Sequence, residues 1–71
     1  MKAELYKNLR QSEQYMYLLE NAIEALSNLW NKFEILNDTR AENIAQAHGS
    51  LTVELNTERE NYKRLINQID K

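Results

Sequence analysis

Apolar residues recur at intervals of three and four over the first half of this sequence, and this spacing constrains the fold more than any other feature. Residues three and four apart lie on the same side of an α-helix, whereas a strand requires alternation by twos. The neighbouring Glu, Gln, Asn, Lys and Ala residues are good or tolerated helix formers. The spacing predicts one helix over residues 3–36, with a core face made of Leu5, Leu9, Met16, Leu19, Ile23, Leu26, Trp30 and Phe33, and with Ser12 at the missing apolar position.

The apolar spacing ends in the polar segment 37–39, where we expect the chain to reverse direction. This segment reads Asn-Asp-Thr, and Asn and Asp favour turns because their side chains bond to nearby backbone. Thr39, with Glu42 three residues later, matches a capping box at a helix start. A second helix is predicted over residues 40–70, with a face made of Ile44, Ala47, Leu51, Leu55, Tyr62, Leu65 and Ile69. The two steps of four within this series indicate a stutter, a local shift of the apolar face around the helix.

The scarcity of turn-forming residues leaves few other places for a bend, because the 71 residues include one glycine and no proline. Gly49 either ends a short helix, with Ser50 capping a third one, or is tolerated inside a continuous helix at a cost of about 1 kcal/mol. We favour the continuous helix because the apolar spacing persists through the glycine. A single rod of about 100 Å is the remaining alternative. It is disfavoured because it would place Asn37 and Arg40 in the core face.

The predicted fold class is therefore all-α, an antiparallel two-helix hairpin that forms a single coiled-coil domain over residues 1–71. Folding back at 37–39 would place Trp30 against Ala47 and Ser12 against Leu65, so that large side chains meet small ones. Leu19 does not fit this register, since it would face Glu58.

The first helix carries a second apolar line beside its core face, which we call the outer stripe. Its residues are Tyr15, Leu18, Ala22, Ala25 and Leu29, and the same spacing continues to Leu36. Two long helices bury less apolar surface than a compact domain of the same length, so the hairpin needs further stabilisation. We expect the outer stripe to bind a protein partner or a second copy, most simply as a homodimer that forms a four-helix bundle. The alternative is that Tyr15 and Leu18 only widen the core of a monomer.

The charge and the cysteine content narrow the class of protein. Nine Lys and Arg against eleven Asp and Glu give a net charge of -2, which weighs against a generic nucleic-acid binder. The predicted hairpin carries +3 on residues 1–10 and 60–71 together, and -5 on residues 11–59. No apolar run is long enough for a membrane span or a signal peptide. Together with the absence of cysteine, this predicts a cytoplasmic protein without a membrane partner.

No group of residues predicts catalysis, so we expect no enzyme, no cofactor and no metal site. His48 is the only histidine, which excludes His-rich metal sites, and it is interpreted as a surface or capping residue. The carboxylate pairs Glu20/Glu24 and Glu54/Glu58 are interpreted as solvated faces.

Residues 44–64 partly match the spacing of a DNA-binding helix-turn-helix, which provides an alternative function. Ala45 precedes Gly49 by four residues, and Leu55 follows it by six. Arg59, Lys63 and Arg64 would then contact phosphates. Glu54 and Glu58 would place negative charge on the reading helix, which weakens this interpretation.

The function that these observations favour is a non-enzymatic protein-protein interaction module. Small bacterial and phage regulators, inhibitors, co-chaperones and assembly subunits are commonly built as helical hairpins, although a fold alone assigns no site. The residues carry no signature of a particular family. Tyr6 and Tyr17 lie off the core face and are secondary candidates for an exposed contact.

Overall fold

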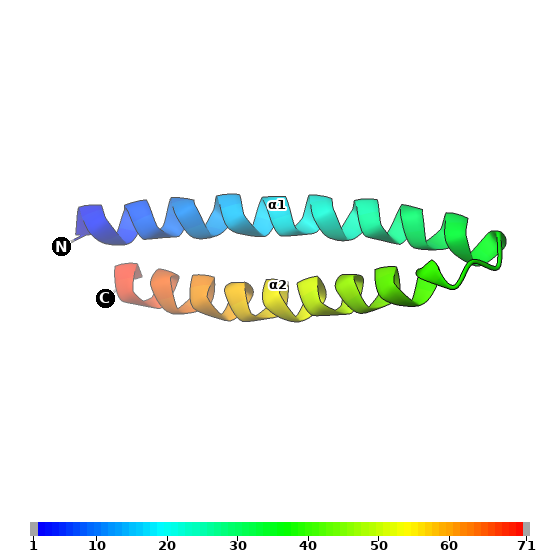
Figure 1. Cartoon of the computed structure of the whole chain (residues 1–71). Coiled ribbons are helices and arrows are strands. Elements are labelled where there is room, and N and C mark those ends of the chain that lie inside the picture. The colour runs from blue at the N-terminus through cyan, green and yellow to red at the C-terminus, as the bar shows by residue number, and fades with distance from the viewer. Residues whose placement is uncertain (1, 71) are drawn as a thin grey trace.

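The computed structural model describes residues 2–70 as two helices joined by a short reversal. Helix α1 spans Lys2–Ile35 and helix α2 spans Arg40–Asp70. The helices run antiparallel side by side, so that the first turn of α1 and the last turn of α2 lie at the same end of the hairpin (Figure 1). The hairpin measures 53 × 14 × 12 Å. The predicted all-α hairpin is confirmed, and these dimensions exclude the single rod.

The reversal occurs at Asn37, the only described non-glycine residue with a positive φ, at 55°. The Asn37 amide donates to the Glu34 carbonyl at 3.0 Å, and the Asp38 amide donates to the Phe33 carbonyl at 2.9 Å. These two bonds form a Schellman motif, which satisfies carbonyls at the end of a helix and usually contains glycine. Asparagine tolerates the left-handed conformation better than other non-glycine residues do. The chain therefore turns at the predicted position without a glycine.

Helix α2 is capped by Asp38, and the predicted Thr39 capping box is wrong. The Arg40 amide donates to Asp38 Oδ1 at 2.9 Å. The Arg40 side chain also donates to this carboxylate, with Nη2 2.7 Å from Oδ2, while its guanidinium lies 4.9 Å from the centroid of the Phe33 ring. Asp38 already has the position and geometry of an N-cap, so the first amides of α2 need no contribution from the Thr39 side chain.

The predicted core face of α1 is confirmed. Its residues are buried or half-buried at strict intervals of three and four from Leu5 to Phe33, and Ser12 occupies its predicted position at 4% exposure. Leu19 is the most deeply buried apolar residue of this helix. Such regular spacing is the heptad pattern of a two-stranded coiled coil.

The core face of α2 differs from the prediction at two positions. Ala47 is exposed, and the half-buried His48 takes its place, while Glu58 occupies a second core position. The observed core residues are Ala41, Ile44, His48, Leu51, Leu55, Glu58, Tyr62, Leu65 and Ile69. These residues are spaced by alternating threes and fours, so the predicted stutter is also wrong. The apolar residues alone concealed this pattern because two core positions carry ionisable side chains.

The contacts between the helices define their register. The Trp30 ring lies 6.0 Å from the His48 ring, so Trp30 pairs with His48 and not with Ala47. Ser12 Oγ donates to Glu58 Oε2 at 2.6 Å, and Leu65 lines the same notch as Ser12. Glu58 thereby finds a hydrogen-bond donor, while Leu19 and Leu55 are the most buried leucines of their helices. The misfit that was expected between Leu19 and Glu58 is resolved.

Gly49 lies inside α2 with a negative φ, which confirms the continuous second helix. A Cβ atom built at this position meets no heavy atom within 4 Å. Neither a turn nor a close approach therefore requires a glycine here, and the glycine only lowers the helix propensity.

We predict that Gly49→Ala raises the free energy of unfolding by about 1 kcal/mol, the difference in helix propensity between the two residues. Ala47→Gly, at another exposed position two residues away in the same helix, should lower it by a similar amount. Urea denaturation followed by circular dichroism at one protein concentration measures both changes. A loss of stability in Gly49→Ala would contradict the open space found around this position.

We predict that Asp38 makes the stability of the hairpin depend on acidic pH. The Arg40 side-chain and backbone hydrogen bonds lower the pKa of Asp38 from 3.8 to about 2. A lowered pKa means that the contribution is present above about pH 4 and is lost as the pH falls through about 2. The difference in melting temperature between wild type and Asp38→Ala should shrink over this range. Asp38→Asn keeps a capping oxygen but has no titrating group. Its melting temperature should therefore change with pH as that of Asp38→Ala does, while lying above it at every pH.

Candidate interaction surface

The outer stripe runs along one side of α1, next to the contact with α2. Leu18 is 63% exposed and Leu29 41% exposed, whereas Ala25 is exposed and Ala22 half-buried. None of the five stripe residues is charged. The structure places the predicted interface residues on one continuous line because they follow each other at intervals of three and four.

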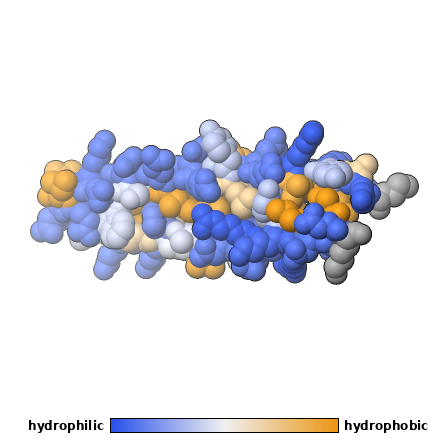
Figure 2. All heavy atoms as spheres, turned by 180° about the vertical axis from the view of Figure 1, so that it is seen from behind, coloured by the Kyte–Doolittle hydropathy of each residue, from blue (hydrophilic) through white to orange (hydrophobic). Residues whose placement is uncertain are grey.

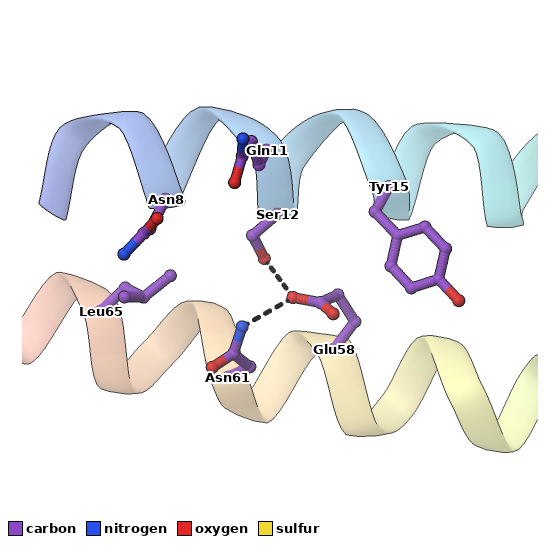
Figure 3. A pocket seen from close by; sticks show the side chains of 7 residues that line it. All are labelled: Asn8, Gln11, Ser12, Tyr15, Glu58, Asn61 and Leu65. Atoms are coloured by element: carbon purple, nitrogen blue, oxygen red, sulfur yellow. Dashed lines mark hydrogen bonds between the residues drawn. The ribbon is translucent and has the colours of Figure 1, made fainter. Parts of the chain in front are cut away.

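Tyr15, at one end of the stripe, also takes part in the contact between the helices. Its ring extends from α1 towards α2 (Figure 3), and its hydroxyl donates to Glu54 Oε1. This hydrogen bond raises the pKa of Tyr15, with desolvation and the Glu54 charge adding to the shift. Tyr15 is therefore held in place by the hairpin, and part of its ring remains on the surface.

Other large apolar side chains outside the five stripe residues are exposed. Tyr6 and Tyr17 are both exposed, as the sequence predicts. Ile35 and Leu36 are exposed at the turn, and Val53 is 65% exposed on α2. Figure 2 shows hydrophobic spheres at the turn end and in a broken line between the helices, with hydrophilic residues around them.

Hydroxyl groups that donate to carboxylates join the two helices, and apolar spacing alone does not predict these pairs. Ser12 Oγ and Asn61 Nδ2 both donate to Glu58 Oε2, at 2.6 and 2.8 Å (Figure 3). The Tyr62 hydroxyl donates to Glu13 Oε1 at 3.0 Å, and this bond raises the pKa of Tyr62. The interpretation as a solvated face is wrong for Glu58, which is half-buried and accepts from Ser12, whereas Glu54 is exposed although it accepts from Tyr15. The one signal in the sequence was the serine in an otherwise apolar core face.

The space around Ser12 is an open notch of about 360 Å³, which hydrogen bonds already cross (Figure 3). Its walls combine polar and apolar surface in similar amounts, and it is lined by Asn8, Gln11, Ser12, Tyr15, Glu58, Asn61 and Leu65. Among residues 2–70, no three His, Asp or Glu side chains are grouped so that they could hold a metal ion. Within the same range, neither helix combines the length and apolar character needed to cross a lipid bilayer.

His48 is half-buried beside Trp30 and is not the surface or capping residue that was predicted. Its imidazole lies at a core position where an aliphatic residue is usual. The His48 carbonyl accepts a bond from Thr52 Oγ1 at 2.8 Å within α2. Its place in the structure is therefore a packing position between the helices.

Residues 44–64 form one uninterrupted helix, so the turn of a helix-turn-helix is absent from this segment. Arg59 Nη2 lies 3.7 Å from Glu20 Oε1, and Lys63 Nζ lies 3.5 Å from Glu60 Oε1. Arg64 is exposed. Two of the three proposed phosphate contacts thus have a carboxylate beside them.

In comparisons with known proteins, no family model matches the chain, and no curated protein or solved structure matches it significantly.

We predict that the tyrosine bonds make the hairpin sensitive to alkali. Because hydrogen bonds to Glu54 and Glu13 raise the pKa values of Tyr15 and Tyr62 above 10.0, their stabilising effect is present below pH 10 and is lost as the pH rises further. In a titration followed by tyrosinate absorbance, the double variant Tyr15→Phe, Tyr62→Phe should lack the two ionisations that occur above pH 10. Its free energy of unfolding should also fall less with rising pH than that of the wild type. Wild-type protein in which every tyrosine ionises at the ordinary pKa would contradict these two bonds.

Proposed function

We propose that this chain is a small non-enzymatic interaction module that binds protein through the outer stripe of α1. The observation that supports the proposal is the uncharged line from Tyr15 to Leu29, in which Leu18 is 63% and Leu29 41% exposed. An exposed apolar patch surrounded by polar residues is typical of a protein interaction site. The partner is a protein or a second copy of the chain, and the role is that of a regulator, inhibitor, co-chaperone or assembly subunit.

The rest of the molecule supplies a rigid support for this surface. Helix α2 packs against the side of α1 next to the stripe, through the core and through the Ser12 and Tyr15 hydrogen bonds, so the stripe is presented on a preformed helix. A preformed surface loses less conformational entropy on binding than a disordered segment does. We place the protein in the cytoplasm, where a chain without cysteine needs no oxidising conditions.

We predict that Leu18→Glu or Ala25→Glu weakens binding by at least about tenfold, because each variant buries an unpaired charge in the interface. Val53→Glu is the matched control, since Val53 is as exposed as Leu18 but lies on α2. Binding is measured by sedimentation of the purified chain and by retention of proteins from a cell extract on the immobilised chain. Circular dichroism checks that all variants stay helical.

Equal loss in the Val53→Glu control, or no loss in either stripe variant, would contradict the proposal. Retention of DNA that weakens steeply with salt would instead support phosphate contacts through Arg59, Lys63 and Arg64.

A further inference from the structure

The hairpin exposes more surface than a compact protein of its mass. Its accessible surface is 5640 Å². A compact monomer of 8.4 kDa exposes about 4,600 Å², so the excess is about 1,000 Å². A standard protein-protein interface buries about 800 Å² on each partner. The extra surface of one hairpin is therefore enough for one stable interface with another molecule.

The outer stripe is symmetric about its own centre. Leu18 and Leu29 lie equally far from the point between Ile23 and Glu24, and so do Ala22 and Ala25. Two antiparallel copies of α1 centred there would place leucine against leucine at both ends. Between them alanine would meet alanine, and small side chains allow two helices to approach closely. A two-fold dimer requires such a self-complementary surface.

The charges beside the stripe are complementary in the same arrangement. Lys32 lies as far from the centre on one side as Tyr15 does on the other. An antiparallel copy would place Lys32 beside Tyr15, whose hydroxyl donates to Glu54. Across residues 2–70, neither Lys32 nor Glu54 has an oppositely charged side chain within 4.0 Å in the hairpin itself. Lys32 of each copy would thus lie beside Glu54 of the other copy, and the dimer would contain two such charge pairs.

We infer that the occupant of the outer stripe is a second copy of this chain. The two α1 helices pack antiparallel, with the two-fold axis between Ile23 and Glu24, and the dimer is a four-helix bundle. This inference rests on the proposed function, because it names the partner of the same surface. It commits to contacts between Leu18 and Leu29 and between Lys32 and the Tyr15–Glu54 pair of the other copy.

Equilibrium sedimentation of the purified full chain tests the dimer itself. The expected mass is twice 8.4 kDa, and Leu18→Glu should raise the dimer dissociation constant by about tenfold or more, while Val53→Glu leaves it unchanged. A monomer at every concentration overturns the inference. The proposed function survives that outcome if the stripe still retains another protein and Leu18→Glu abolishes the retention.

Cysteine cross-linking tests the register, and the chain has no cysteine of its own to interfere. A mixture of Leu18→Cys and Leu29→Cys should oxidise to a cross-linked dimer that contains one chain of each. Either variant alone should cross-link poorly, because eleven residues of helix separate the two sites by about 16 Å. Efficient cross-linking of Leu18→Cys with itself would indicate parallel helices and overturn the inference. A mixture of Leu18→Cys with Val53→Cys is the control for random collisions.

A charge exchange tests the complementarity. Lys32→Glu should weaken the dimer by about tenfold, because it places like charges next to each other at two symmetric positions. Adding Glu54→Lys should restore much of the affinity by reversing the pair. Rescue supports the antiparallel arrangement, since a purely structural loss at Lys32 would not be repaired at Glu54. Further weakening in the double variant overturns this contact.

Discussion

The alignment of the two helices depends on the left-handed backbone of Asn37. Because Asn37 has a positive φ, the amides of Asn37 and Asp38 donate hydrogen bonds to two carbonyls at the end of α1. Asp38 then caps the first turn of α2. Arg40 then joins the Asp38 carboxylate to the face of Phe33, the last core residue of α1. Because so few residues connect the helices, their relative position at the turn determines which side chains meet along the hairpin.

Polar groups complete this alignment inside a thin core. Ser12 and Glu58 bond across the helices at core positions where an apolar side chain is usual, whereas Tyr15 and Glu54 bond beside the core at the exposed edge. A buried hydroxyl or carboxylate without its partner is costly, so sliding one helix along the other would leave Ser12 and Glu58 unsatisfied. Such contacts add little net stability but discriminate strongly between registers. A hairpin of two helices gains specificity from them.

The same thin core explains why one helix carries two apolar lines. A pair of helices buries a single strip of each, and no large side chain of residues 2–70 is fully buried. Helix α1 therefore has apolar surface left after it has packed on α2. A second hairpin on the outer stripe would enclose α1 on two sides, as in a four-helix bundle.

Local backbone preference and apolar periodicity act over neighbouring residues, so the two helices, the reversal at residues 37–39 and the core face of α1 could be predicted from the sequence. It did not reveal that His48 and Glu58 occupy core positions or that Asp38 caps α2. In the sequence pattern, an ionisable residue at a core position cannot be distinguished from a surface residue until its partner on the other helix is known. Only the tertiary structure brings Trp30 and Ser12 to these residues, since residues far apart in the chain meet through the register of the helices.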